Sequence, residues 1–191
     1  MKFIKRLKKI NKLYYTIADI LTITNYSENS LYVILNRLVK QGELIRITSG
    51  IYILPEQYGE IERIANALYF PSYLSFDTAL AKFGVISQLP YTLMFATPLK
   101  TKTIQLSNYK AEYKKLKKEL FFGYTTNKEG LLIATPEKAL FDIYYISSFG
   151  KMYFDFKSID STKVEIEKVK YMIKKYLNRD SIELNNTLLR P

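Results

Sequence analysis

The side chains that come nearest to a catalytic constellation are Asp77, Glu137, Lys138 and Asp142. Carboxylates can hold a magnesium ion, so these residues raise the alternative of a metal-dependent nuclease. Their spacing matches no nuclease signature, and Glu137 has a structural explanation at the start of a helix that Thr135 would cap. The chain contains no His and no Cys, which excludes a Ser-His-Asp triad, a thiol nucleophile and a metal site built on either residue type. The sequence therefore predicts a protein that is not an enzyme, with no catalytic residues, no metal and no cofactor.

A second group of side chains is suited to contacting duplex DNA. Asn, Ser and Arg hydrogen-bond base edges, Tyr and Val can meet a thymine methyl group, and Lys and Arg contact phosphates. The chain carries a net charge of +11 over 191 residues, and a field of this sign attracts polyanions. The DNA-binding residues that we predict are Ser27, Asn29, Ser30, Tyr32, Val33, Asn36, Arg37, Lys40, Arg46, Thr48, Ser49, Lys5 and Lys9.

Three predicted helices and a hairpin would position these residues. Apolar side chains recur at helical spacing over residues 3–10, 16–21 and 27–41. Two β-branched runs, residues 43–48 and 51–54, flank a Gly-containing turn, which is typical of a β-hairpin. This order of helix, helix, turn, helix and two-stranded wing is that of a winged helix-turn-helix domain, which we place at residues 1–56.

The third predicted helix would enter the major groove. Ser27 is a favourable N-cap, and Gly42 suits the position that ends the helix. Its core stripe is Leu31, Ile34, Leu35 and Leu38. Only Arg37 and Lys40 are cationic on the opposite face, so most phosphate contacts would come from the wing, the first helix or the second domain. Two alternatives remain open, because a basic face can simply be solvated and winged helices also serve in protein–protein contacts.

The rest of the chain, residues 60–191, is predicted to be a separate α+β domain after a short linker at residues 57–59. Helices are expected over residues 60–69, 75–84, 135–146 and 162–177, followed by a polar tail. Candidate strands are residues 91–97, 102–106, 112–116, 120–124 and 131–134. The connections are too short for crossover helices, so we expect a mainly antiparallel sheet flanked by helices.

A run of lysines falls within this predicted sheet. Its members are Lys110, Lys114, Lys115, Lys117 and Lys118. Lysines on an edge strand or loop keep a protein soluble and block edge-to-edge pairing, and this is the interpretation that we favour. The alternative is a second contact with nucleic acid.

Three stretches carry more specific patterns. They are residues 38–52 (LVKQGELIRITSGIY), 71–84 (PSYLSFDTALAKFG) and 134–142 (ATPEKALFD). Together they resemble the AbiEi-type antitoxins of type IV toxin–antitoxin (abortive infection) systems and related winged-helix transcriptional regulators. The first stretch is general among winged helices, and the other two are considerably more specific.

The resemblance implies a function for both domains. A winged helix would repress its own operon by binding repeats in its promoter. A C-terminal antitoxin domain would counter a nucleotidyltransferase-like toxin, a genetic partner encoded alongside, without forming a stable complex with it. The implied protein is a cytoplasmic component of phage defence, and we expect a monomer in solution or a weak dimer on DNA.

These expectations compete with other functions. The main alternative is an orphan transcriptional regulator whose C-terminal domain senses a ligand or a protein partner. The nuclease considered above is a further alternative. The chain has no run of eighteen apolar residues, so we expect no transmembrane helix and no membrane partner.

Overall fold

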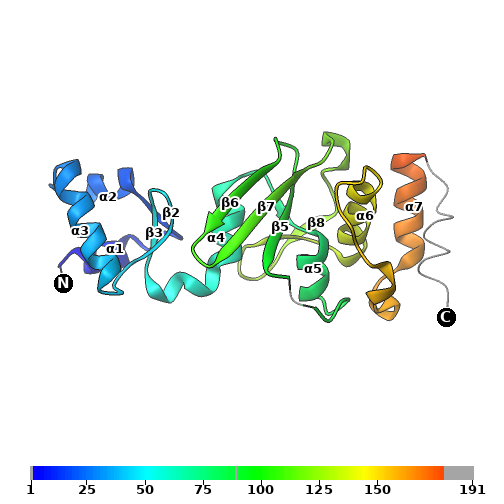
Figure 1. The fold of residues 1–191 in the computed structure, drawn as a ribbon, viewed down its shortest axis with the longest axis horizontal. Helices are drawn as coiled ribbons and strands as arrows, with labels where there is room; N and C mark the ends of the chain where they lie inside the picture. The colour runs from blue at the N-terminus through cyan, green and yellow to red at the C-terminus, as the bar shows by residue number, and fades with distance from the viewer. Residues whose placement is uncertain (1, 89, 179–191) are drawn as a thin grey trace.

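The computed structural model describes residues 2–88 and 90–178 and has an α+β architecture. The molecule is elongated, as Figure 1 shows, with three helices and a small sheet at one end and a larger sheet in the middle. The polar tail expected at the C-terminus falls on residues 179–191, which lie outside the described residues.

The N-terminal part contains three helices and a three-stranded antiparallel sheet. The elements are α1 (Lys2–Ile10), β1 (Tyr15–Thr16), α2 (Ile17–Ile23), α3 (Glu28–Lys40), β2 (Ile45–Thr48) and β3 (Ile51–Ile53), with strand order β1-β3-β2. Both predicted N-caps are present. The Thr16 hydroxyl accepts from the Asp19 amide while the Asp19 carboxylate accepts from the Thr16 amide, and the Ser27 hydroxyl accepts from the Ser30 amide. Strand β1 was not predicted, because two residues give no alternating pattern.

One apolar cluster holds these elements together. Its buried members are Leu7, Tyr15, Ile20, Leu31, Leu35, Leu38, Leu44, Tyr52 and Leu54. Three of the four residues predicted as the core stripe of α3 are among them, whereas Ile34 is half-buried. Tyr15 is fully buried, and its hydroxyl donates to the Leu7 carbonyl at 2.8 Å, which satisfies the polar group inside the cluster. With one side of α3 fixed against this core, its opposite side faces solvent.

The segment expected to be a linker is instead a 3-10 helix, Pro55–Glu60, that leads into α4 (Ile61–Leu68). Its Gln57 is buried and donates to the Lys12 carbonyl at 2.5 Å. The β2–β3 hairpin also contacts the second part of the chain, because the Ser107 amide donates to the Ile47 carbonyl at 2.7 Å. Ile47 and Ile53 are buried in the apolar cluster of the second part. The hairpin thus packs against both cores.

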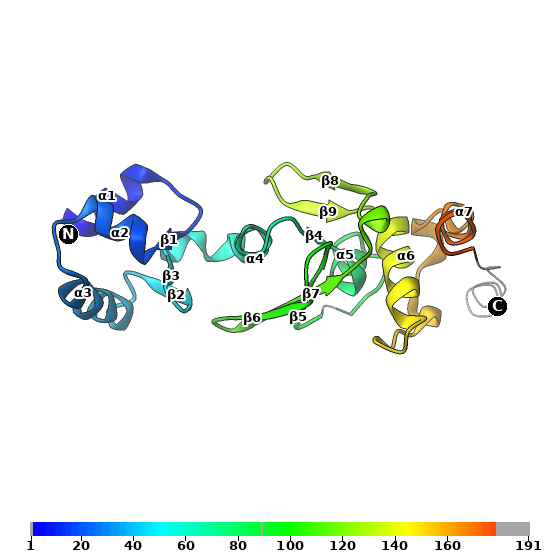
Figure 2. The ribbon, with the colours of Figure 1, turned by 90° about the horizontal axis from the view of Figure 1, so that it is seen from above.

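The second part is built on a mixed six-stranded sheet. Its strands are β4 (Tyr73–Leu74), β5 (Thr92–Thr97), β6 (Lys102–Leu106), β7 (Tyr109–Lys115), β8 (Tyr124–Thr126) and β9 (Leu132–Ala134), in the order β6-β7-β5-β4-β9-β8. Helix α4 lies on one side of this sheet, and α5 (Phe76–Lys82) and α6 (Pro136–Ser147) lie on the other, as Figure 2 shows. Helix α7 (Ile166–Leu177) packs on α6 at the far end.

The sheet is mainly antiparallel, as predicted, but two of its pairs are parallel. β5 pairs with β7, and β4 pairs with β9, in parallel. Short connections do not prevent parallel pairing of β5 and β7, because β6 carries the chain between them and forms a hairpin with β7. They do not prevent it for β4 and β9 because these strands are far apart in the sequence.

Several predicted element boundaries were wrong. The strand predicted over residues 120–124 is a short 3-10 helix, Lys118–Leu120, followed by β8, which begins only at Tyr124. β7 begins at Tyr109, before the predicted residue 112, and β4 was not predicted. The last helix begins at Ile166, because residues before it form a separate 3-10 helix, Ser161–Lys163.

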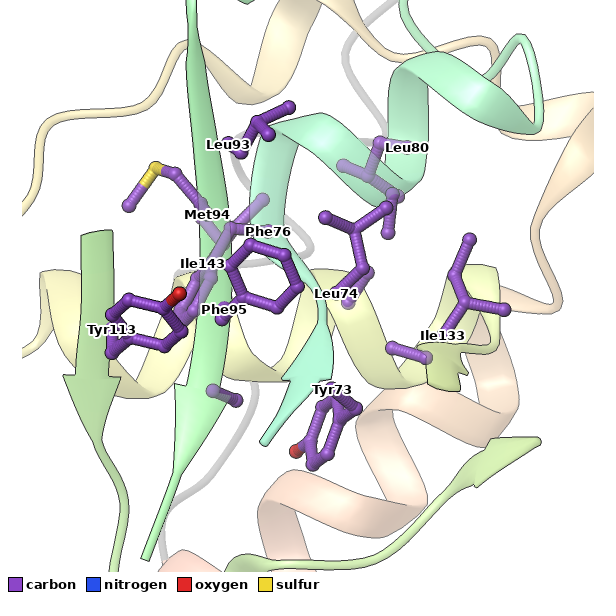
Figure 3. Close-up of a cluster of buried hydrophobic side chains, with 14 of the residues drawn as sticks. Tyr73, Leu74, Phe76, Leu80, Leu93, Met94, Phe95, Tyr113, Ile133 and Ile143 are labelled. Atoms are coloured by element: carbon purple, nitrogen blue, oxygen red, sulfur yellow. The ribbon is translucent and has the colours of Figure 1, made fainter. Parts of the chain in front are cut away.

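Helix α6 lies at the centre of this part of the molecule. Every residue from Glu137 to Ile146 is buried, because α5, α7 and the sheet surround the helix. Figure 3 shows its Ile143 beside Phe76 and Phe95 in the main apolar cluster. Within residues 2–88 and 90–178, no helix is long and apolar enough to cross a bilayer.

Candidate nucleic-acid interface and a buried polar network

The exposed side of α3 carries the polar residues predicted to read base edges. Asn29, Ser30, Asn36, Arg37 and Lys40 are all exposed there. Two apolar or aromatic side chains lie on the same side: Val33 is 69% exposed and Tyr32 is 44% exposed. A valine this exposed adds little to the core, and single apolar side chains at a protein surface are common.

The hydrogen bonds of α3 divide these residues into two groups. Ser27 and Ser30 bond to each other through their hydroxyls at 2.9 Å, and Tyr32 donates weakly to Glu28 at 3.4 Å. In the described part of the chain, by contrast, the side chains of Asn36 and Arg37 form no hydrogen bond or ion pair. The same holds for Asn29, Val33 and Lys40. Asn29 in the first turn and the residues from Val33 onward are therefore free to contact a ligand, while Ser27 and Ser30 serve the helix cap.

The remaining predicted DNA-binding residues lie on the hairpin and on α1. Arg46 on β2 and Ser49 in the turn are exposed, while Thr48 is half-buried beside an irregularity in the β2–β3 register. The turn depends on Gly50, whose φ of 71° favours glycine. On α1, Lys5 and Lys9 are exposed and have no ion-pair partner among the described residues.

Other cations in and just after α1 bond to groups of the same domain. Lys8 pairs with Glu56 at 2.9 Å, and Arg6 donates to the Ile23 carbonyl at 3.1 Å. Lys12, after the helix, pairs with Asp19 at 2.5 Å, and this bond together with the Thr16 cap lowers the pKa of Asp19. The net positive charge of the chain therefore overstates the number of cations free for phosphate.

We favoured a lysine run on an edge strand or a loop, and the edge-strand placement is wrong. β7 lies between β6 and β5 and so is an internal strand. Lys110 and Lys114 both pair with Glu112, which lies between them on the strand, and the two lysines hold the pKa of that carboxyl below its usual range. Lys115, Lys117 and Lys118 lie at and beyond the end of the strand and are exposed.

Two of the four residues considered for catalysis, Lys138 and Asp142, lie in a buried network between the sheet and α6. Lys138 and Asp142 lie one helical turn apart on α6 and form an ion pair, although their side chains are only 1% and 0% exposed. Lys138 also donates to the Tyr73 hydroxyl at 2.8 Å. Asp142 accepts from Tyr73 at 3.0 Å and from Ser75 at 2.8 Å. The four side chains form a closed set that ties β4 and the start of α5 to α6.

The surroundings of the network are apolar and tightly packed. The Lys138 ammonium lies 4.9 Å from the centre of the Phe122 ring and 5.1 Å from that of Phe141, within the range of a cation–π contact. Gly123 approaches the Lys138 stem so closely that a Cβ at this position would lie 3.0 Å from it. Burial raises the pKa of Asp142 and lowers the pKa of Lys138. The attraction between the two charges acts in the opposite direction on both pKa values. Burial also raises the pKa of Tyr73, with a further contribution from Asp142.

The network gives Ser75, Lys138 and Asp142, which belong to the motifs at residues 71–84 and 134–142, partners inside the protein. Ser75 was predicted as an N-cap, but its hydroxyl makes no capping bond and serves Asp142 instead. Glu137 lies on α6 but accepts from the Glu165 amide at 3.3 Å, and Asp77 accepts from the Thr78 amide. Among the residues that the structure describes, no three acidic side chains gather so that they could hold a metal ion.

Sequence reasoning missed the network as a unit. Tyr73 was named only as part of a motif, and Lys138 and Asp142 were considered as candidate catalytic residues. The available signal was the four-residue spacing of Lys138 and Asp142 on a helix whose neighbouring residues are apolar on all sides.

A scan of the chain against models of known protein families found no match, and a search of curated proteins found none either.

Proposed function

We propose that residues 1–56 form a winged helix-turn-helix and that the protein is a DNA-binding transcriptional autorepressor. The observation that carries the proposal is the unpaired polar face of α3, opposite the buried Leu31, Leu35 and Leu38. A helix fits the major groove, where each base pair presents a distinct set of donors and acceptors. The β2–β3 hairpin, with Arg46 and Ser49 exposed, takes the place of the wing.

Phosphate contacts would come from more than one element. Arg37 and Lys40 on α3, Arg46 on the hairpin, and Lys5 and Lys9 on α1 are the exposed cations that this domain has available. Such contacts supply affinity, while Asn36 and Arg37 are placed to distinguish bases. Because Ser27 and Ser30 are engaged in the helix cap, we expect them to contribute less than Asn36 or Arg37.

The experiment compares two variants that each lose one positive charge. Arg37→Ala removes a cation from the proposed groove face, and Lys128→Ala removes one from the exposed turn between β8 and β9. Binding to a duplex from the region upstream of the gene is measured by fluorescence anisotropy. We expect Arg37→Ala to weaken binding by about 1–3 kcal/mol and Lys128→Ala to leave it unchanged. Equal effects of the two variants would remove the groove assignment.

The second part of the proposal is that the protein acts as the antitoxin of a type IV toxin–antitoxin system and is not an enzyme. It is supported by the motifs at residues 71–84 and 134–142, whose Ser75, Lys138 and Asp142 form the buried network of the second domain. This part of the proposal predicts a nucleotidyltransferase-like gene beside the gene for this protein, and co-expression of the two genes tests it. We expect growth to be rescued without a stable complex on size exclusion, and a failure of rescue would remove the antitoxin role while leaving DNA binding intact.

One observation favours the alternative of a regulator that responds to a ligand or partner. The hairpin is attached to the second domain through the bond from the Ser107 amide to the Ile47 carbonyl and through burial of Ile47. A change in the position of β6 would therefore alter the hairpin and its contact with DNA. Under this alternative, the affinity for DNA changes when a ligand occupies the second domain. The same anisotropy assay, repeated with the ligand added, measures this change in affinity.

A further inference from the structure

A cleft in the second domain combines lysines with aromatic rings. It has a volume of about 440 Å³ and lies where the end of β7 meets the end of α6. Its lining includes Lys114, Lys115 and Lys117 from the β7 side and Tyr145, Phe149 and Lys151 from the α6 side. A volume of this size falls in the range of small-molecule sites.

The charge of the cleft is unbalanced. None of its lining residues is acidic, although the Glu119 carboxylate is near enough to contribute, after burial, to the raised pKa of Tyr145. Lys114 is paired with Glu112, but Lys115, Lys117 and Lys151 have no ion-pair partner among the described residues. Cations brought together without counter-charges repel one another, so the arrangement is relieved by an anion with several charges.

The aromatic side of the cleft offers a surface for a planar group. Tyr145 is nearly buried, and Phe149 stands edge-on to it with ring centres 5.1 Å apart. Phe149 is 53% exposed, at the point where α6 has ended and the chain turns at Gly150. Phe149 leaves half its surface in water, and the Lys151 ammonium lies 5.8 Å from the centre of its ring. A base would stack on this ring once Lys151 turns to the phosphates.

We propose that this cleft binds a nucleoside triphosphate, with its phosphates on Lys115, Lys117 and Lys151 and its base on Phe149. The site lies on elements separate from α3 and the hairpin, so it goes beyond the proposed reading of DNA and does not depend on it. It would give the second domain a small-molecule ligand of defined chemistry.

The test uses the full chain and a fluorescent ATP analogue, followed by anisotropy, with unlabelled competitors. We expect saturable binding with a Kd below about 1 mM, displaced by ATP. Lys117→Ala combined with Lys151→Ala should abolish it, whereas the matched pair Lys128→Ala and Lys168→Ala, which removes the same charge from exposed positions, should not. Arg37→Ala should leave nucleotide binding unchanged, which separates this proposal from the one on DNA.

A second comparison separates stacking from charge. We expect Phe149→Ala to weaken ATP about tenfold while displacement by inorganic tripolyphosphate stays the same. Phe83→Ala, which removes another exposed ring, is the control. Three results would overturn the proposal: no saturable binding, equal losses in the two lysine pairs, or displacement by an oligonucleotide but not by ATP.

Discussion

Removing one partner of the buried ion pair should destabilise the protein far more than removing a surface charge. Lys138→Met keeps an unbranched side chain, one atom shorter, but leaves the Asp142 carboxylate fully buried, with only the Tyr73 and Ser75 hydroxyls as donors. An uncompensated buried charge of this kind costs about 3–5 kcal/mol. Exposed pairs such as Lys8–Glu56 contribute far less, because water screens their charges. The free energy of unfolding of a domain is about 5–15 kcal/mol, so the single change removes a large part of it.

We expect strong coupling between Lys138 and Asp142 in a double-mutant cycle. Asp142→Asn alone leaves the Lys138 ammonium buried without its anion, and we expect a similar loss of about 3–5 kcal/mol. The double variant has no unpaired charge, so it should be no less stable than either single variant. Urea unfolding followed by circular dichroism measures the three free energies, with an osmolyte added if a single variant is unfolded in buffer. Additive losses of less than about 1 kcal/mol each would refute the account of the network.

Three further changes test other parts of the structure by the same unfolding assay. Gly123→Ala places a Cβ 3.0 Å from the Lys138 stem at a φ of 71°, and it should cost about 1–3 kcal/mol; an unchanged midpoint would show that the contact relaxes freely. Asp19→Asn should cost about 1 kcal/mol at neutral pH, because it removes the ion pair with Lys12 and weakens the cap with Thr16. The pKa of Asp19 is lowered in the folded state, so this difference should disappear as the pH falls through the folded pKa, and a constant difference would contradict the assignment. Burial raises the pKa of Asp77, so its ionised form is unfavourable when folded, and Asp77→Asn should stabilise the protein at neutral pH but not below the unfolded pKa; a loss of stability at neutral pH would reverse this conclusion.

Local signals in the sequence were sufficient for the elements that carry the proposed DNA contacts. The Ser27 cap, the apolar spacing of α3 and the Gly50 turn are all set by residues within a few positions of one another. The same holds for Thr135, whose hydroxyl accepts from the Lys138 amide as predicted for the start of α6. Helix caps and turns depend on neighbouring residues, so they can be recognised without the rest of the fold.

Features that depend on distant residues were missed or misread. Ser75 looks like a helix cap from its neighbours, but its partner Asp142 lies 67 residues away. The role of Lys138 depends on Tyr73, which lies 65 residues before it, and on the close approach of Gly123. Pairing over such separations is decided by packing, which a local pattern does not contain. The parallel pairing of β4 with β9 was missed for the same reason.

The central claim is tested most directly by comparing the duplex upstream of the gene with a scrambled duplex of the same length, by anisotropy over a series of salt concentrations. We expect a specificity ratio of about a thousand or more for the upstream duplex, with a salt slope that gives the number of phosphates engaged. Arg37→Ala and Asn36→Ala should reduce that ratio, because both side chains are unpaired on the exposed side of α3. Equal and weak binding to both duplexes would contradict the claim and would mean that the positive charge of the chain serves only a general attraction to polyanions.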